Sequence, residues 1–220
     1  MTLPISRRLI LGFILPLVMA GVDPALAQTV GRSEPLDTRV QRFLSGARNQ
    51  WRDWNILYED GKALYDMIVK KNFTRALEIG TSTGHSAIWI AWALSKTGGK
   101  LITIEMDKTR HDTAVRNFEK AGVASYIDAR LADAHRLVKE LEGPFDFVFS
   151  DADKDWYTQY FKDIDPKLVV GGCYTAHNVL RSGGHGVEEF LGYVRNLPNY
   201  RTSIDRSSSE GISISCKVVK

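Results

Sequence analysis

The stretch from Ala76 to Ala91 constrains the fold of this chain more than any other. Its apolar run, Ala76 to Ile79, breaks at Gly80, and a loop of small residues leads through Gly84 into a periodic apolar segment. This order predicts a strand, a tight turn and a helix, which make the first half of a βαβ unit. The two glycines allow the backbone to approach a ligand closely, and the start of the helix offers unpaired N–H groups.

A second predicted strand ends in an acidic residue. The β-branched segment Leu101 to Ile104 is followed by Glu105, about 20–25 residues beyond the glycine loop, where a carboxylate can accept hydrogen bonds from both hydroxyls of a ribose. We therefore expect a nucleotide-like ligand, with Glu105 and the neighbouring Met106 among its contacts. The alternative, a βαβ turn that binds nothing, is disfavoured by this acid.

The loop itself disfavours a dinucleotide. Dinucleotide sites use G-x-G-x-x-G, whereas this chain has Ser82 at the second glycine position and Glu78 just before the loop. A carboxylate at Glu78 would repel a pyrophosphate but suits a ligand that carries an ammonium and a sulfonium. The stretch resembles the S-adenosylmethionine (SAM) loop of class I methyltransferases. That resemblance makes a set of loop residues candidates for cofactor binding: Glu78, Gly80, Ser82, Gly84 and Ser86.

Residues 1–27 have the pattern of a secretory signal peptide. Arg7 and Arg8 precede an apolar run, and the small residues of Ala25–Ala27 form a cleavage site. The apolar run is shorter than the ~20 residues of a membrane span, so we expect no stable span after cleavage. Export is therefore predicted, to a compartment such as the periplasm. A general secretion signal and a twin-arginine signal both remain open.

After a flexible leader at 28–36, we expect residues 37–220 to form one domain. The chain has 29 basic and 26 acidic residues and a formal net charge of +3. It shows no basic block or aromatic-interleaved stripe, so nucleic acid is not an expected partner.

Candidate catalytic residues follow two later strands. Phe145 to Phe149 is apolar on both faces, as in a central parallel strand, and is followed by Asp151. The strand predicted from Leu168 to Thr175 is followed by His177 and Asn178. Because ligands of open α/β sheets bind at the carboxyl ends of the strands, Asp151, His177 and Asn178 form a plausible divalent metal site beside the loop.

Taken in order, these features resemble the metal-dependent O-methyltransferases of the catechol and caffeoyl-CoA type. The glycine loop, the acidic strand end, the D-A-D-K-x-x-Y motif at 151–157 and the H-N pair carry the resemblance, which runs from about Glu59 to the C-terminus. It implies that Asp151 binds the metal and contacts the cofactor, that Lys154 is the general base, and that Asn178 completes the metal site. It also implies that Glu59, of an E-x-G motif, and the Asp133–Ala134 turn lie near the cofactor. Asp133 serving only as a helix N-cap is an equally open interpretation.

His177 departs from the pattern, since the family usually has aspartate there. One carboxylate, an imidazole and an amide favour Zn, Mn or Fe over Mg. The alternative is that the metal has been lost and that His177 orients substrate or acts as a base.

The resemblance implies a Rossmann-like α/β fold, in which helices cover both faces of a seven-stranded, mostly parallel sheet with a C-terminal antiparallel hairpin at 200–205 and 211–219. Cys173 and Cys216 would then lie on neighbouring strands. Adjacent strands often miss disulfide geometry, so we expect two unpaired, buried thiols.

The function implied is metal-assisted methyl transfer from SAM to a hydroxyl of a small, catechol-like acceptor, with Lys154 and Asp151 as catalytic residues. A glycine-rich loop at 180–186 is the expected substrate-side loop, where His185 could add a ligand. The different-class alternative is an exported small-molecule or metal-binding protein that keeps the fold without methyl transfer. A homodimer is compatible with either.

Overall fold

The computed structural model describes residues 34–51, 53–180 and 184–219. The predicted signal peptide at 1–27 and most of the leader at 28–36 lie outside these residues. Residues 35–220 make one compact unit. Among the described residues, no helix combines the length and apolar character needed to cross a membrane.

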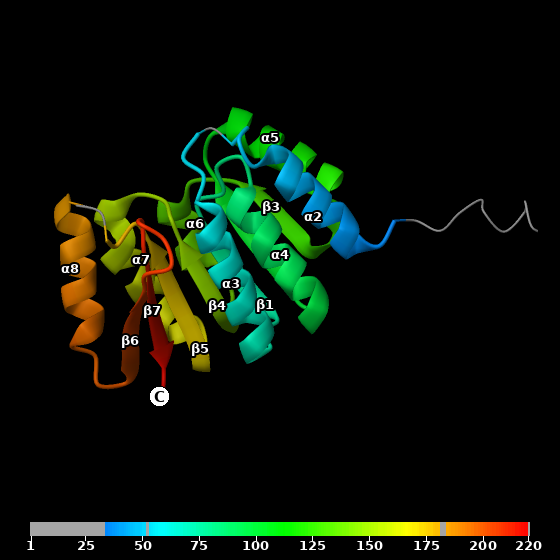
Figure 1. Ribbon diagram of the computed structural model, residues 1–220. Coiled ribbons are helices and arrows are strands. Elements are labelled where there is room, and N and C mark those ends of the chain that lie inside the picture. The colour runs from blue at the N-terminus through cyan, green and yellow to red at the C-terminus, as the bar shows by residue number, and fades with distance from the viewer. Residues whose placement is uncertain (1–33, 52, 181–183, 220) are drawn as a thin grey trace, which may run out of the picture. The chain divides into compact units, whose positions relative to one another are not determined.

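The sheet has seven strands in the order β3-β2-β1-β4-β5-β7-β6 (Figure 1). The first five strands pair in parallel, whereas β7 runs antiparallel to both β5 and β6. This is the predicted class I methyltransferase topology with its antiparallel C-terminal hairpin. The strands are β1 (Arg75–Ile79), β2 (Lys100–Glu105), β3 (Ile127–Leu131), β4 (Phe145–Ser150), β5 (Leu168–His177), β6 (Tyr200–Asp205) and β7 (Ile212–Lys217).

Helices cover both faces of the sheet (Figure 1). On one face, apolar side chains of α2, α3, α4 and α5 pack in a single buried cluster, and on the other face α6, α7 and α8 do so. The helices are α2 (Leu36–Ala47), α3 (Tyr58–Lys71), α4 (His85–Thr97), α5 (Lys108–Ala121), α6 (Ala134–Glu140), α7 (Tyr157–Ile164) and α8 (Gly184–Arg195). Ten consecutive residues of α4, His85 to Leu94, are buried, which explains why its sequence is apolar on nearly every side.

The central strand β1 lies between β2 and β4, and the chain crosses over in opposite directions from it. Ligands of open α/β sheets bind in the crevice that forms at such a switch point, outside the carboxyl ends of the strands. Backbone hydrogen bonds join these ends: Gly80 N–H donates to Ile104 O over 3.1 Å, and Asp151 N–H donates to Ile79 O over 2.9 Å. The tips of β1, β2 and β4 are thereby fixed side by side.

The prediction of two free thiols is wrong. Cys173 of β5 and Cys216 of β7 form a disulfide, with a Cα–Cα distance of 4.0 Å. The two residues are direct partners in the antiparallel ladder, so their side chains leave the sheet on the same face. The sequence predicts that the strands are neighbours but not this register, which decides whether the sulfurs meet.

Candidate active site

A cavity of about 810 Å³ opens at the carboxyl ends of β1, β2, β4 and β5. It collects most of the residues predicted to bind cofactor or metal, from segments far apart in the chain: Gly80, Ser82, Ser86, Glu105, Met106, Asp133, Ala134, Asp151, Lys154, His177 and Asn178. Three predicted residues do not line it, namely Glu59, Glu78 and Gly84. Its size is within the range of small-molecule and cofactor sites.

The glycine loop is shaped by backbone geometry. Gly80 has φ +97°, and a Cβ placed there would lie only 3.0 Å from Asp151 C and Ala152 N at the end of β4. Gly84 also has positive φ and lies at the start of α4, where an added Cβ would meet the Phe118 ring at 2.5 Å. Glycine at both positions therefore permits the turn and its close packing.

Glu105 lies at the cavity wall with its carboxylate held by the backbone. Oε2 accepts a hydrogen bond from the Ser82 N–H over 2.8 Å, and Oε1 accepts one from the Asp107 N–H over 2.9 Å. Each oxygen keeps a further lone pair, since an ionised carboxylate has about four acceptor sites. The carboxylate can therefore fix the loop and still accept hydrogen bonds from a ligand's hydroxyls.

Glu78 lies behind the loop. Its side chain is fully buried on β1, and its Oε2 accepts a hydrogen bond from the Thr103 hydroxyl. Burial raises the pKa of Glu78 to about 8, although hydrogen bonds from Ser86 and Thr103 oppose that rise. The carboxyl is therefore neutral at pH 7 and supports the loop, whereas the sequence predicts a charged contact to the cofactor.

The far side of the cavity is aromatic and acidic. Asp133 is the N-cap of α6, where its Oδ1 accepts a hydrogen bond from the His135 N–H over 2.9 Å. The structure therefore shows the N-cap role, and because Asp133 also lines the cavity, its contact with the cofactor stays a prediction. The His135 imidazole contacts Trp156 at a tilt of 45°, with ring centroids 4.0 Å apart, and stacks on Tyr160, which also lines the cavity.

Lys154 and Asp151 form a partly buried ion pair at the tip of β4. The Lys154 Nζ donates to Asp151 Oδ1 over 2.5 Å and to the Tyr157 hydroxyl over 2.8 Å. Tyr157 in turn donates to the His177 carbonyl over 3.2 Å. The Lys154 side chain is therefore held at the cavity wall by Asp151, at the end of β4, and by Tyr157 of α7, which is itself bonded to β5.

His177 lies between two carboxylates. Its Nε2 is 3.0 Å from Asp60 Oδ2 and its Nδ1 is 3.2 Å from Asp151 Oδ2. The first contact is a well-aligned hydrogen bond, whereas the second is an ion pair in which the N–H direction is off line. Burial alone would lower the pKa of His177, but hydrogen bonding and charge of Asp151 and Asp60 outweigh it and raise the pKa to about 9. Burial likewise opposes ionisation of Asp151, yet His177 and Lys154 lower its pKa overall.

In this structure the predicted metal ligands pair with neighbouring side chains. Both oxygens of Asp151 already face cations, Lys154 on one side and His177 on the other. His177 Nε2 is hydrogen-bonded to Asp60, whereas Nδ1, 3.2 Å from Asp151 Oδ2, has no aligned hydrogen-bond partner in the described structure. Asn178 donates through Nδ2 to Glu210 over 2.8 Å. Within the described ranges, no three His, Cys, Asp or Glu side chains are grouped as a metal site would need.

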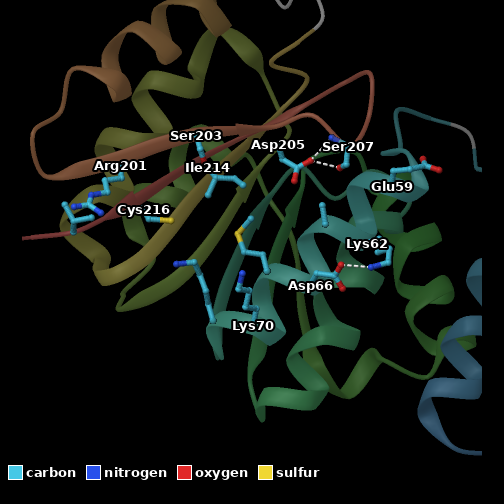
Figure 2. A pocket seen from close by; sticks show the side chains of 14 residues that line it. Glu59, Lys62, Asp66, Lys70, Arg201, Ser203, Asp205, Ser207, Ile214 and Cys216 are labelled. Carbon is cyan, nitrogen blue, oxygen red and sulfur yellow. Dashed lines mark hydrogen bonds and ion pairs between the residues drawn. The ribbon is translucent and has the colours of Figure 1, made fainter.

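Glu59 lies elsewhere. It lines a separate pocket between α3 and the β6–β7 hairpin, where Figure 2 shows it at one end of a row with Lys62 and Asp66. Its neighbour Asp60 points inward instead and reaches the site through His177. A signal for this existed in the sequence: Asp60, Leu64 and Ile68 recur at helical spacing, and all three are buried.

Sequence reasoning missed further residues of the wall. Trp54, Asn55 and Leu57, which precede α3, line the cavity, as do Arg110, His135, Tyr160 and Glu210. Trp54 is 85% exposed and its ring lies 5.4 Å from the Arg110 guanidinium. Asn55 donates to the Thr83 hydroxyl over 2.8 Å and so ties this segment to the loop. His185, which the sequence offers as an extra ligand, is exposed on α8 and is not among the lining residues.

Comparison with known proteins yields one consistent family. A family model described as O-methyltransferase matches residues 37–189. The chain is 42% identical over 111 residues to the catechol O-methyltransferase of Niastella koreensis, across 49% of this chain and 50% of that protein. It is 32% identical over 163 residues to caffeoyl-CoA O-methyltransferase 1 of Eucalyptus globulus, across 72% of this chain and 65% of that protein. These matches thus span half to two thirds of the relatives' length.

Solved structures share the fold at lower identity. The SAH-bound methyltransferase PaMTH1 of Podospora anserina has a TM-score of 0.74 at 21% identity, covering 95% of this chain and all of that one. The O-methyltransferase of Bacillus cereus, in complex with SAH, has a TM-score of 0.70 at 22% identity, covering 89% of this chain and 96% of that one.

Proposed function

The chain belongs to the O-methyltransferase family, and on that premise we propose that it transfers a methyl group from SAM to a hydroxyl oxygen of a small acceptor. The observation that carries the proposal is the continuity of one cavity. It joins the glycine loop and Glu105, at the tips of β1 and β2, to Asp151 and Lys154 at the tip of β4. A methyl donor in the first half would thus face a charged catalytic group in the second.

A catechol-like acceptor is the proposed substrate class. The named relatives include a catechol and a caffeoyl-CoA methyltransferase, and aromatic side chains border the cavity at Trp54 and Tyr160. An aromatic acceptor would pack on such rings, with its hydroxyl directed toward Lys154.

The reaction is an in-line displacement. The acceptor O–H loses its proton, the oxygen forms a bond to the methyl carbon, and the pair of electrons of the C–S bond returns to sulfur, which leaves a neutral thioether. We propose that Lys154, as a neutral amine, accepts this proton and becomes an ammonium. Positioning of oxygen, methyl and sulfur supplies ~7–11 kcal/mol in a well-oriented site of this kind.

Asp151, His177 and Asn178 are the residues that would hold a divalent cation, and no step of the proposed mechanism depends on one. In the family type that the motifs resemble, a divalent cation would lower the pKa of the acceptor hydroxyl. In the structure, the side chains of Lys154 and His177 lie on either side of the Asp151 carboxylate.

We further propose that the mature enzyme works outside the cytosol. The pattern of residues 1–27 supports export, and the Cys173–Cys216 disulfide suits an oxidising compartment. Export raises the question of how SAM reaches the enzyme, and for that reason the alternative is an exported binding protein that keeps the fold without methyl transfer.

Calorimetric titration with SAM, followed by an assay of methyl transfer to catechol, separates the two. Saturable SAM binding and a methylated product support the enzyme. Binding of a catechol without SAM binding would favour the alternative. An absence of SAM binding to the folded protein would overturn the proposed activity.

A further inference from the structure

A second groove, of about 840 Å³, lies between α3 and the β6–β7 hairpin (Figure 2), and among the described residues it shares none with the cavity at the strand tips. Its size is within the range of small-molecule sites. Ala63 and Met67 are one turn apart on α3, and Ile214 and Cys216 alternate on β7, so each pair points to one side of its element. All four line the groove, are partly buried and pack against the core beneath. They give the groove an apolar floor.

The acidic side chains that line the groove already have partners. Each contact is local: Glu59 with Arg48 over 3.7 Å, Asp66 with Lys62 over 2.5 Å, and Asp205 Oδ1 with the Ser207 N–H over 2.8 Å. The negative charge of the groove is therefore matched from within the chain.

Two cations of the groove have no such partner. Lys70 is exposed on α3 and Arg201 on β6, and neither side chain makes a hydrogen bond or ion pair within the residues that the structure describes. Figure 2 shows them on opposite sides of the groove, at the end away from Asp205 and Glu59. A lysine in the last turn of a helix complements the helix dipole, but Arg201, on a strand, has no such role. One end of the groove thus carries unmatched positive charge.

We propose that this groove binds an amphipathic carboxylate of the fatty-acid class, with its alkyl chain on the apolar floor and its carboxylate between Lys70 and Arg201. Charge complementarity identifies the head group, since a guanidinium and an ammonium both donate charge-assisted hydrogen bonds to a carboxylate. From Glu59 to Lys70, α3 spans ~16 Å, a length that an extended laurate chain matches.

The floor favours an alkyl chain over an acidic peptide. The backbones of β6 and β7 pair with each other along the hairpin, so this face of the hairpin offers side chains and not free N–H or C=O groups. A peptide lying on it would keep backbone groups without partners, whereas an alkyl chain has none to satisfy. The proposal does not depend on methyl transfer.

The direct test is calorimetric titration of the full chain with laurate below its critical micelle concentration. We expect saturable binding of one laurate per chain. Acetate, which lacks the chain, and dodecyltrimethylammonium, which has the chain with a positive head group, should not saturate the protein at the same concentrations. Equal binding of laurate and dodecyltrimethylammonium would overturn the proposal, as would an absence of laurate binding.

Charge-removing variants test the head-group end. Lys70→Gln and Arg201→Gln should each weaken laurate binding by about 2- to 5-fold, the scale of an exposed ion pair, and the double variant should weaken it further. Lys162→Gln is the matched control and should bind as the wild type does, because Lys162 is exposed on α7 and does not line the groove. Wild-type affinity in the double variant would refute the inference.

A blocking variant tests the location. Ser203 is exposed on β6 and lines the groove, so Ser203→Trp would fill it with a side chain that strands accommodate well. We expect this variant to lose laurate binding while its circular dichroism and thermal unfolding stay those of the wild type. Laurate binding that survives in the folded variant would place the probe elsewhere and contradict the proposal.

Two other occupants are distinguished by the same proteins. A chain that binds no laurate but sediments with vesicles of dioleoylphosphatidylglycerol would have a membrane-facing surface here. A chain that binds no laurate but forms a dimer that Ser203→Trp dissociates would cover this face with a second copy. Either result would overturn the proposal. If no methyl transfer is found, the proposed function fails alone, because the laurate titrations do not use that activity.

Discussion

The two halves of the cavity are built by different means. The cofactor half depends on backbone: Gly80 permits the turn, and the Ser82 N–H binds Glu105 only 23 residues away. The catalytic half depends on charged side chains that meet across the fold, since Asp60 and His177 are 117 residues apart. The first half can be recognised from local sequence, whereas the second exists only once α3, β4 and β5 have packed together.

The largest expected effect comes from a substitution that changes the catalytic half alone. Lys154→Met removes the proposed base and should lower methyl transfer by about 10²- to 10⁴-fold, the usual contribution of general acid–base catalysis. SAM affinity, measured by calorimetry, should stay unchanged, because the cofactor half does not depend on this side chain. Lys162→Met is the control, since Lys162 is exposed on α7 and lies against the Tyr193 ring. Joint loss of binding and transfer would identify Lys154 as structural.

The second effect concerns the scaffold behind the catalytic half. The disulfide ties β5, the strand that ends at His177, to β7 across a separation of 43 residues. In the chain-entropy model a loop of that length stabilises the fold by about 4 kcal/mol. We expect reduction to lower the free energy of unfolding by about that amount, measured by denaturant titration with and without reductant.

The double variant Cys173→Ala with Cys216→Ala serves as control for that measurement and should be insensitive to reductant. Thiol titration of denatured, unreduced protein should find no free thiol. Two thiols per chain would contradict the disulfide.

The difference between the cofactor half and the catalytic half also explains which parts of the structure could be predicted from the sequence. The glycine loop, the acid at the end of β2 and the antiparallel hairpin follow from local patterns, and the structure has all three. Lys154 and Asp151 follow from a motif on one strand tip. The topology then places these tips together by a general rule of α/β sheets.

The predictions that failed depended on strand register and on contacts between residues far apart in the chain. The choice of Glu59 over Asp60 neglected which face of α3 is buried, and the helical spacing with Leu64 and Ile68 could have corrected it. The partner of Asp60 could not be read in the same way, because nothing local links α3 to β5. The disulfide was missed because a shift of one residue in the β5–β7 ladder would have separated the sulfurs.

A smaller effect tests the cofactor half. Glu105→Ala should weaken SAM binding by ~1.5–3 kcal/mol, the scale of a hydrogen bond to a charged group. The variant also frees the Ser82 N–H, which loosens the loop. Calorimetry measures the change, and Glu140→Ala, an exposed acid at the end of α6, should leave affinity unchanged. If Glu105→Ala bound SAM as tightly as the wild type does, Glu105 would not be a cofactor-binding residue.

The smallest expected effect tests whether Glu78 is a buried residue that supports the glycine loop or a charged residue that contacts the cofactor. The pKa of Glu78 is raised from 4.5 to about 8 in the folded chain. Between those values the unfolded chain has released a proton that the folded chain retains, so stability is greatest below the unfolded pKa and is lost as pH rises through the folded one. The free energy of unfolding therefore falls by up to about 1.4 kcal/mol per pH unit, the slope that corresponds to one proton released on unfolding.

Glu78→Gln removes this titration and keeps the side chain's size. Compared with wild type, we expect the variant's stability to fall less as pH is raised from about 6 to about 7, by at most ~1.4 kcal/mol, in denaturant titrations at both pH values. The variant should also keep its SAM affinity, because Glu78 lies behind the loop and is neutral. Parallel pH profiles together with weakened SAM binding would show instead that Glu78 is ionised and faces the cofactor. The cofactor half would then rely on a charged side chain in addition to its backbone, and the difference between the two halves would narrow.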